Sequence, residues 1–259
     1  MKKGMPALFA LALAAFAAGS LHAQADPFAA TVAQTKSSDP RARYDGAGAL
    51  AGFRTPRSVA VLTALLSSDP DGRVRQAAAS SLGQLGDSSA VPALIAALKD
   101  VSSPARFAAV RSLGGLRSPA AVPALSALLG DPDPSMRRTV AQMLGQIGDP
   151  AAKQALKKSL TDADEGTRLE AADGLARMGD AGGQAAAYDG LRSKDPVARR
   201  RAARALARSD DPAASSALDA AYAGEKDLAT RAALGEARSR IRERLGRKKA
   251  AAPAARAKP

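Results

Sequence analysis

The chain contains 259 residues, of which 46% are hydrophobic, 3% are aromatic and none is cysteine or tryptophan. Its formal net charge is +13, and its single histidine is His22. The absence of cysteine excludes a disulfide framework. After His22 the sequence offers no Cys–His or Ser–His dyad and none of the common zinc or haem ligands. We therefore expect no metal, no cofactor and no enzymatic activity.

The first 25 residues have the three regions of a secretory signal peptide. Lys2 and Lys3 give a basic start, residues 7–18 form a short apolar run, and Ala23-Gln24-Ala25 has the pattern of a cleavage site. The apolar run is too short to anchor the chain in a membrane. We therefore expect residues 1–25 to be removed and the protein to be exported, either to a periplasm or out of the cell.

The chain from residue 26 onward is a repeat array with a period of 31 or 32 residues. Its most regular columns are one of arginine and two of leucine. The arginine column consists of Arg43, Arg75, Arg106, Arg137, Arg168 and Arg199. The first leucine column, seven residues later, consists of Leu50, Leu82, Leu113, Leu144, Leu175 and Leu206. The second consists of Leu62, Leu94, Leu125 and Leu156, then Ala187, then Leu218.

Each repeat contains two amphipathic segments separated by Asp, Ser, Gly and Pro. In one repeat, Arg73–Leu85 and Ala90–Leu98 both carry apolar residues on one helical face. No segment rich in Val, Ile or Thr alternates with period two, so no strand is expected. Because two short helices cannot bury their apolar faces alone, the pairs must stack. The pattern predicts an all-α solenoid of about seven antiparallel helix pairs over residues 26–245.

Aspartates precede several of the predicted helices at the same place in the repeat: Asp71, Asp133, Asp164 and Asp195. A carboxylate there accepts a free N–H of the first helical turn and meets the positive end of the helix dipole. We expect these four residues to be helix N-caps, which accounts for them without any catalytic role.

The repeated unit resembles HEAT repeats of the short type found in phycobilin lyase subunits and many bacterial proteins. An Asp and an Arg stand six residues apart, followed by Leu-Gly-x-Leu-Gly-Asp and Ala-Val-Pro-Ala-Leu in the best copies. The matching pairs are Asp69/Arg75, Asp100/Arg106, Asp131/Arg137 and Asp162/Arg168, while Ser37 and Ser193 replace the Asp in two copies. The resemblance covers residues 27–237. It implies a superhelical binding scaffold whose Arg-bearing helices line the concave face.

The Asp and Arg columns have two interpretations. The arginines form a ligand-binding ladder, or each pairs with the Asp six residues before it and with the equivalent Asp of the next repeat. We favour the second, a structural ladder that joins successive turns. It predicts that Arg137→Ala loosens the stack locally instead of abolishing a binding site.

Positions one and five residues after each column arginine share its helical face and vary between repeats. Aromatic and Arg side chains dominate binding hot spots, so Tyr44 and Phe107 are the expected apolar anchors. A solvated face without a ligand explains the same pattern. The predicted partner-binding residues are Tyr44, Phe107, Arg111, Arg138, Gln142, Glu170, Asp173, Arg200, Arg201 and Arg204.

Most of the net charge lies at the C-terminal end of the chain. From Arg238 onward there are nine Lys or Arg and one Glu, whereas residues 26–237 are nearly balanced. We expect the last helix to end near Leu245 and residues 246–259 to form a disordered basic tail. The tail is either a solubilising end or an electrostatic contact with an anionic surface or nucleic acid.

These features favour an exported, non-enzymatic scaffold that binds a protein or peptide partner. One alternative is a bilin lyase or isomerase subunit, which the resemblance implies but which an export signal does not fit. Another is binding to DNA or RNA. The nearly neutral array and the scarcity of stacking aromatics count against nucleic acid.

Overall fold

The structure, a computed structural model, describes residues 26–256, with side chains as far as Lys249. The predicted signal peptide, residues 1–25, and the last three residues lie outside this range. All regular elements of the described range are helical. The all-α prediction is confirmed.

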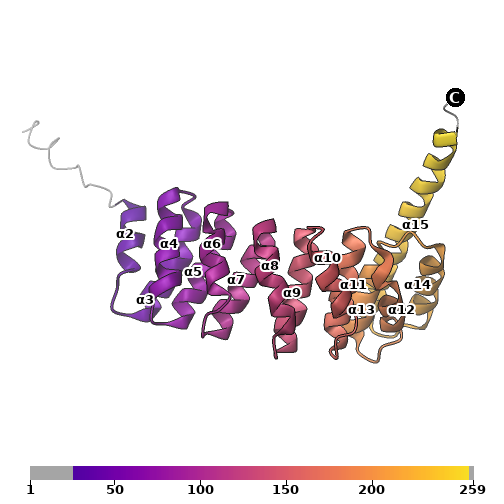
Figure 1. Ribbon diagram of the computed structural model, residues 1–259, viewed down its shortest axis with the longest axis horizontal. Helices are drawn as coiled ribbons and strands as arrows, with labels where there is room; N and C mark the ends of the chain where they lie inside the picture. Colours follow the sequence, from indigo (N-terminus) through magenta and orange to yellow (C-terminus); the bar gives the residue numbers. More distant parts are fainter. Residues whose placement is uncertain (1–25, 257–259) are drawn as a thin grey trace, which may run out of the picture.

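The helices form seven antiparallel pairs, as the period predicts, arranged in a row along the molecule (Figure 1). Short 3-10 turns precede or follow several of them. The pairs are α2 (Pro27–Gln34) with α3 (Pro40–Ala49), α4 (Pro56–Ser68) with α5 (Gly72–Leu85), α6 (Val91–Ala97) with α7 (Ser103–Gly115), α8 (Val122–Ala127) with α9 (Pro134–Ile147), α10 (Ala152–Ser159) with α11 (Glu165–Arg177), α12 (Gln184–Gly190) with α13 (Pro196–Leu206), and α14 (Pro212–Gly224) with α15 (Leu228–Arg256).

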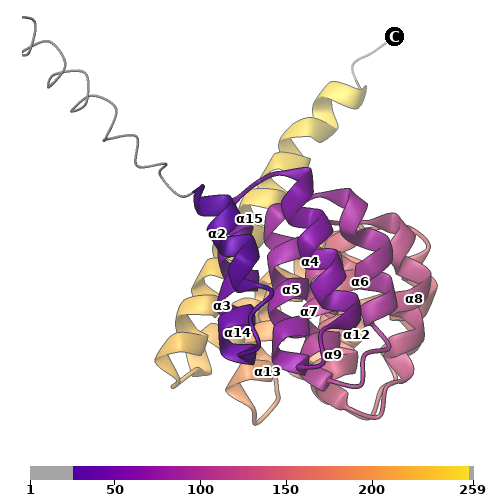
Figure 2. The same cartoon turned by 90° about the vertical axis from the view of Figure 1, so that its left-hand side faces the viewer.

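The two helices of each pair belong to two layers, and the odd-numbered layer is the tighter one. Each odd-numbered helix from α5 to α13 packs closely on the odd-numbered helices of both neighbouring repeats, whereas even-numbered helices touch one another sparsely. A stack curves towards its more closely spaced layer. Figure 2 shows the resulting curl from the end of the stack. The odd-numbered helices, which carry the arginine column, therefore line the concave face.

The helix starts follow the repeating aspartates. Asp71, Asp133, Asp164 and Asp195 each accept a backbone N–H of the helix that follows. All four predicted N-caps are confirmed. Since these caps recur at one place in the repeat, local sequence fixes where α5, α9, α11 and α13 begin, whereas Ser102 before α7 makes no side-chain cap.

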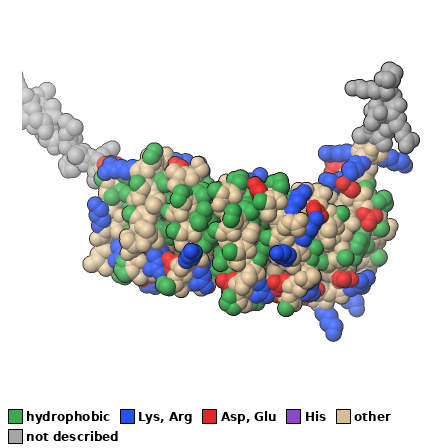
Figure 3. All heavy atoms as spheres, viewed as in Figure 1, with side chains coloured by type: hydrophobic (Ala, Val, Ile, Leu, Met, Phe, Trp, Pro, Cys, Tyr) green, Lys and Arg blue, Asp and Glu red, His purple; other side chains and the backbone are tan. Residues whose placement is uncertain are grey.

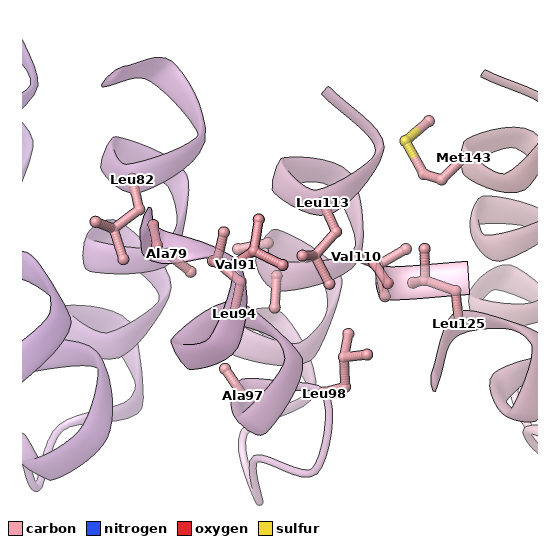
Figure 4. Close-up of a cluster of buried hydrophobic side chains, with 14 of the residues drawn as sticks. Ala79, Leu82, Val91, Leu94, Ala97, Leu98, Val110, Leu113, Leu125 and Met143 are labelled. Atoms are coloured by element: carbon pink, nitrogen blue, oxygen red, sulfur yellow. The ribbon is translucent and has the colours of Figure 1, made fainter. Parts of the chain in front are cut away.

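The two leucine columns run through the core (Figure 4). Every residue of both columns, including Ala187, is at most 1% exposed. Figure 4 shows Leu94 and Leu113 of the α6–α7 pair between Leu82 of α5 and Leu125 of α8. The buried side chains fall into two clusters that meet at α11. No repeat has a complete core of its own, so each depends on its neighbours for burial.

Small residues allow the odd-numbered helices to approach one another. A Cβ atom on Gly83 would lie 2.3 Å from Oγ of Ser112 on the next odd-numbered helix. The closest backbone approach joins α9 and α11, where a Cβ atom on Gly145 would lie 2.4 Å from Cα of Gly174. These glycines provide space for a neighbouring helix.

Arg117 is the only non-glycine residue with positive φ in the described range, at φ 49°. It stands where other repeats end the helix with a left-handed glycine, as at Gly86 and Gly148. An L-residue in this conformation loses roughly 1–2 kcal/mol, and a glycine there adds about 0.5–1 kcal/mol of unfolded-state entropy. We therefore expect Arg117→Gly to raise the free energy of unfolding by about 0.5–1 kcal/mol, measured by urea denaturation. The reverse change, Gly148→Ala, should lower it, and stabilisation by both changes would contradict this account.

The last helix differs from the expectation. We predicted an end near Leu245 and disorder from residue 246, but α15 continues to Arg256 and projects beyond the stack (Figure 1). Its first part packs on α13 and α14, and Leu234, Ala237 and Ile241 are buried there. After Ile241, three basic residues of α15 pair with aspartates of the stack: Arg242 with Asp219, and Arg244 and Lys248 with Asp210. The sequence pattern alone did not reveal these partners.

Candidate partner-binding face

The column arginines join each turn of the stack to the next, with a geometry that Arg75 illustrates. Its Nε and Nη2 atoms donate to the two carboxylate oxygens of Asp100 in the next repeat, both at 2.7 Å. Its Nη1 atom donates to the carbonyl oxygens of Asp69 and Pro70 at 2.7 and 3.2 Å. The arginine thus contacts the backbone, and not the carboxylate, of the Asp six residues before it.

Four column arginines make such bidentate pairs across repeats. They are Arg43 with Asp69, Arg75 with Asp100, Arg137 with Asp162, and Arg199 with Glu225. The sequence reasoning missed Glu225. It stands 32 residues after Ser193, so the period alone could have assigned it to the Asp column. Each carboxylate also accepts a backbone N–H two residues later, which holds the turn in place.

Two rungs of the predicted ladder lack the cross-repeat pair. Arg106 donates to the carbonyl of Asp100, and Arg168 donates to the carbonyls of Asp162 and Ala163. Within the described range neither arginine forms an ion pair with the next repeat. The carboxylate of Asp131 instead accepts the backbone N–H of Asp133 in its own turn. In the repeat after Arg168, Ser193 occupies the Asp column. Its hydroxyl accepts the backbone N–H of Asp195 but carries no charge to pair with Arg168.

The ladder makes stability depend on pH in the acid range. Hydrogen bonds from Arg75 and Arg137 lower the pKa of Asp100 and Asp162, although burial opposes this. The unfolded chain therefore binds protons more readily than the native chain, and acid favours unfolding. We expect the free energy of unfolding to hold above about pH 5 and to fall as the pH drops through about 4 and below. Urea denaturation of wild type and Asp162→Asn should show a stability difference at pH 7 that shrinks at pH 3, whereas a constant difference would contradict it.

The predicted anchors lie on a hollowed part of the concave face. An open hollow between α5 and α7 is lined by Gln76, Ser80, Phe107 and Arg111, among others. Phe107 is half-buried against the core, so part of its side chain remains exposed. Tyr44, in the same column on α3, is 44% exposed. These residues combine aromatic surface with free polar groups, which suits a docked polypeptide.

Beyond α7 the predicted face is divided between free and internally paired side chains. Gln142 is exposed. Arg138 pairs with Asp164 at 3.1 Å, and Arg200 donates to Thr230 at 2.9 Å and pairs with Asp227 at 3.4 Å.

Two acidic residues of the predicted face are buried and do not face a partner. Glu170 is 5% exposed and Asp173 is 2% exposed. Arg201 and Arg204 on α13 donate to Glu170 at 2.8 and 3.1 Å, and Arg204 also lies 3.5 Å from Asp173. The facing helix thus neutralises both carboxylates. We correct the expectation here: these four charges join α11 to α13.

The basic helix α15 is attached to the stack by two aspartates. Arg238 and Arg242 pair with Asp219, while Arg244 and Lys248 pair with Asp210. Figure 3 shows basic side chains around the place where α15 leaves the stack. Part of the charge that the sequence assigns to a free tail is therefore neutralised by the array.

The sequence model of the HEAT-repeat family matches residues 28–108, 91–172 and 158–238 of this chain. The chain belongs to the HEAT-repeat family. Comparison of the HEAT array with curated protein sequences gave no match. The predicted family and solenoid architecture are confirmed.

Solved structures resemble the HEAT array in fold. A chain of the complex of CpcE and CpcF of phycocyanin lyase from Nostoc sp. PCC7120 matches with 24% identity and a TM-score of 0.59, covering 82% of this chain and 93% of that one. A HEAT-like repeats protein from Thermococcus onnurineus NA1 matches with 16% identity and a TM-score of 0.57, covering 84% and 98%. A chain of the structure in which Kap95p binds RanGDP matches with 14% identity and a TM-score of 0.54, covering 88% and 38%.

The described part of the HEAT array has no grouping of three or more His, Cys, Asp or Glu side chains suited to a metal ion. Over the same range no helix combines the length and the apolar character needed to cross a membrane.

Proposed function

We propose that this HEAT array is an exported, non-enzymatic scaffold that holds a protein or peptide partner against its concave face. The observation that carries the proposal is the hollow between α5 and α7, where Phe107 and Arg111 lie together beside Gln76. The complexes of CpcE with CpcF and of Kap95p with RanGDP support it, since arrays of the same fold bind other proteins. The concave charges beyond α9 are largely engaged within the array, which favours the α3–α7 half as the contact surface.

The test is a comparison of two variants of the protein spanning residues 26–259. Tyr44→Ala combined with Arg111→Glu alters the concave face without removing a buried side chain. Gln154→Ala combined with Lys158→Ala alters exposed residues of α10, on the opposite layer. A partner purified from the native envelope fraction should bind the first variant at least ten-fold more weakly than the second, by surface plasmon resonance. Equal affinities would exclude the concave hollow as the contact surface.

Export is tested separately. The signal-peptide pattern predicts that the protein isolated from cells begins near Asp26 and is found outside the cytoplasm. Intact-mass measurement after cell fractionation checks both points. A full-length cytoplasmic protein would contradict export and leave the binding proposal standing.

The projecting part of α15 supports a second role, contact with an anionic surface. Arg247 and Lys249 are exposed near the point where α15 extends beyond the stack, and Figure 1 shows this projecting helix. Removing residues 246–259 should weaken binding to vesicles containing anionic lipid and should reduce the salt dependence of that binding. Unchanged binding would leave α15 as a structural end of the array.

The likeness to the phycocyanin lyase complex keeps a bilin-related activity as the enzymatic alternative. Co-expression with a bilin and a phycocyanin subunit distinguishes it, since covalently coloured product would favour a lyase subunit. A colourless product supports the scaffold.

A further inference from the structure

The hollow between α5 and α7 is lined by two rows of side chains, one from each of these neighbouring helices (Figure 1). Both rows follow successive helical turns. They consist of Gln76, Ser80 and Gln84 on α5, and of Phe107, Arg111 and Gly115 on α7. The repeat period places Phe107 beside Gln76 and Arg111 beside Ser80. The hollow therefore offers an aromatic ring and, one turn later, a guanidinium group.

Arg111 has no carboxylate partner within the described residues. Of the polar side chains that line the hollow, only Ser112 makes a hydrogen bond within the described array, to the carbonyl of Ala79 at 2.9 Å. The later arginines of the concave face differ, because Arg138 and Arg200 each pair with an aspartate of the next repeat. Arg111 is also exposed, so its charge can be neutralised by a carboxylate that a partner brings.

No acidic side chain of the two helices competes for Arg111. Neither α5 nor α7 contains Asp or Glu. In the turns before these helices, Asp71 pairs with Arg73 at 3.0 Å and Asp100 pairs with Arg75 at 2.7 Å. The hollow thus has one charged lining residue, and that residue is positive. A carboxylate complements it, whereas a basic side chain would be repelled.

The spacing of Phe107 and Arg111 suits an extended chain. Four residues of α-helix rise about 6 Å, and alternate residues of an extended chain, which face the same side, lie about 7 Å apart. The row from Gln76 to Gln84 spans about 12 Å, the length of about four extended residues. Past Arg111 the hollow stays open, because a Cβ atom on Gly115 would meet nothing within 4 Å. The side-chain amides of Gln76 and Gln84 can each donate to and accept from a peptide group.

We propose that the hollow holds an extended segment of the partner in which an apolar residue and an Asp or Glu stand two positions apart. The apolar side chain packs on Phe107, the carboxylate pairs with Arg111, and the glutamine amides bond the backbone of the segment. This assignment rests on the proposed function, since it names the chemistry of the partner that the concave face holds.

The probe is the blocked peptide Ac-Ser-Phe-Ser-Asp-Ser-NH₂, used with the same sequence reversed because the hollow fixes a spacing and not a chain direction. Binding to the protein spanning residues 26–259 is followed by ¹H–¹⁵N NMR of the amides of α5 and α7. Asparagine in place of the aspartate should weaken the tighter peptide about five-fold. Alanine in place of its phenylalanine should weaken it at least as much.

A peptide with phenylalanine and aspartate adjacent tests the spacing. It should bind more weakly than the spaced peptide, because neighbouring side chains of an extended chain point to opposite sides. Equal binding of the spaced and adjacent peptides, equal binding of the aspartate and asparagine peptides, or no binding of either aspartate peptide would overturn the proposal.

Arg111→Gln tests the carboxylate contact on the protein side. In this variant the aspartate and asparagine peptides should bind equally, because the charged residue of the hollow is gone. Arg41→Gln is the matched control, since Arg41 is exposed on α3 and does not line the hollow. It should keep the five-fold preference for aspartate. A preference that persists in Arg111→Gln, or one that is lost equally in Arg41→Gln, would overturn the assignment.

The partner purified from the native envelope fraction distinguishes failure of this assignment from failure of the proposed function. Arg111→Gln alone should weaken its binding about five-fold. If Arg111→Gln leaves the affinity unchanged while Tyr44→Ala lowers it, the concave contact stands and the acidic segment is excluded. If the combined Tyr44→Ala and Arg111→Glu variant leaves the affinity unchanged, the proposed function fails, and the acidic segment fails with it.

Discussion

Replacing Gly145 by alanine is expected to lower the free energy of unfolding by about 2 kcal/mol. The added Cβ would lie 2.4 Å from Cα of Gly174, a backbone atom that no change of rotamer can move away. The two helices α9 and α11 must therefore separate, at a cost of about 3 kcal/mol. Alanine returns about 1 kcal/mol through its higher helix propensity, which is too little to compensate.

The effect should also be localised. In a repeat array each unit is stabilised by its neighbours, so weakening one interface separates the stack into two parts. Hydrogen exchange should show faster exchange in α9 and α11 than in α5 and α7, and urea unfolding should become less cooperative. Gly48→Ala is the matched control, because a Cβ there meets nothing within 4 Å. It should stabilise by about 0.5 kcal/mol, and a comparable loss in both variants would refute the close-approach explanation.

Replacing Arg137 by alanine is expected to lower the free energy of unfolding by about 2 kcal/mol. Surface pairs contribute roughly 0–1 kcal/mol, whereas breaking a fully buried pair costs roughly 3–5 kcal/mol. The side chains of Arg137 and Asp162 are 16% and 12% exposed, which places this pair between those limits. The change also removes the hydrogen bonds to the carbonyls of Asp131 and Pro132, so the turn loses its support.

The variant Arg168→Ala distinguishes the contribution of the ion pair from that of the hydrogen bonds to the turn. Arg168 makes the same carbonyl contacts but has no cross-repeat carboxylate, so its loss should cost less than half as much as the loss of Arg137. A double-mutant cycle of Arg137→Ala and Asp162→Ala isolates the pair itself, with an expected coupling of about 1–2 kcal/mol. Equal destabilisation by Arg137→Ala and Arg168→Ala would show that the arginines act through the turns alone.

The local features of the array could be read from its repeats. The helix pairs, the N-caps such as Asp71 and the buried column leucines recur at one spacing, and each depends on interactions within a few residues or with the next copy. Even Glu225 could have been assigned by counting from Ser193. Repetition averages out the ambiguity of any single segment, so the period was a reliable guide to the fold.

The candidate sites depended on contacts between side chains of different repeats, which the repeat columns do not show. Glu170 and Arg201 appeared as neighbours on an exposed face, but their helices turn towards each other and the charges pair. The sequence by itself determined the units and their stacking order, because those follow from local periodicity. Only the tertiary structure decided which side chains face a neighbour and which remain free to bind, because that depends on the spacing and rotation between repeats.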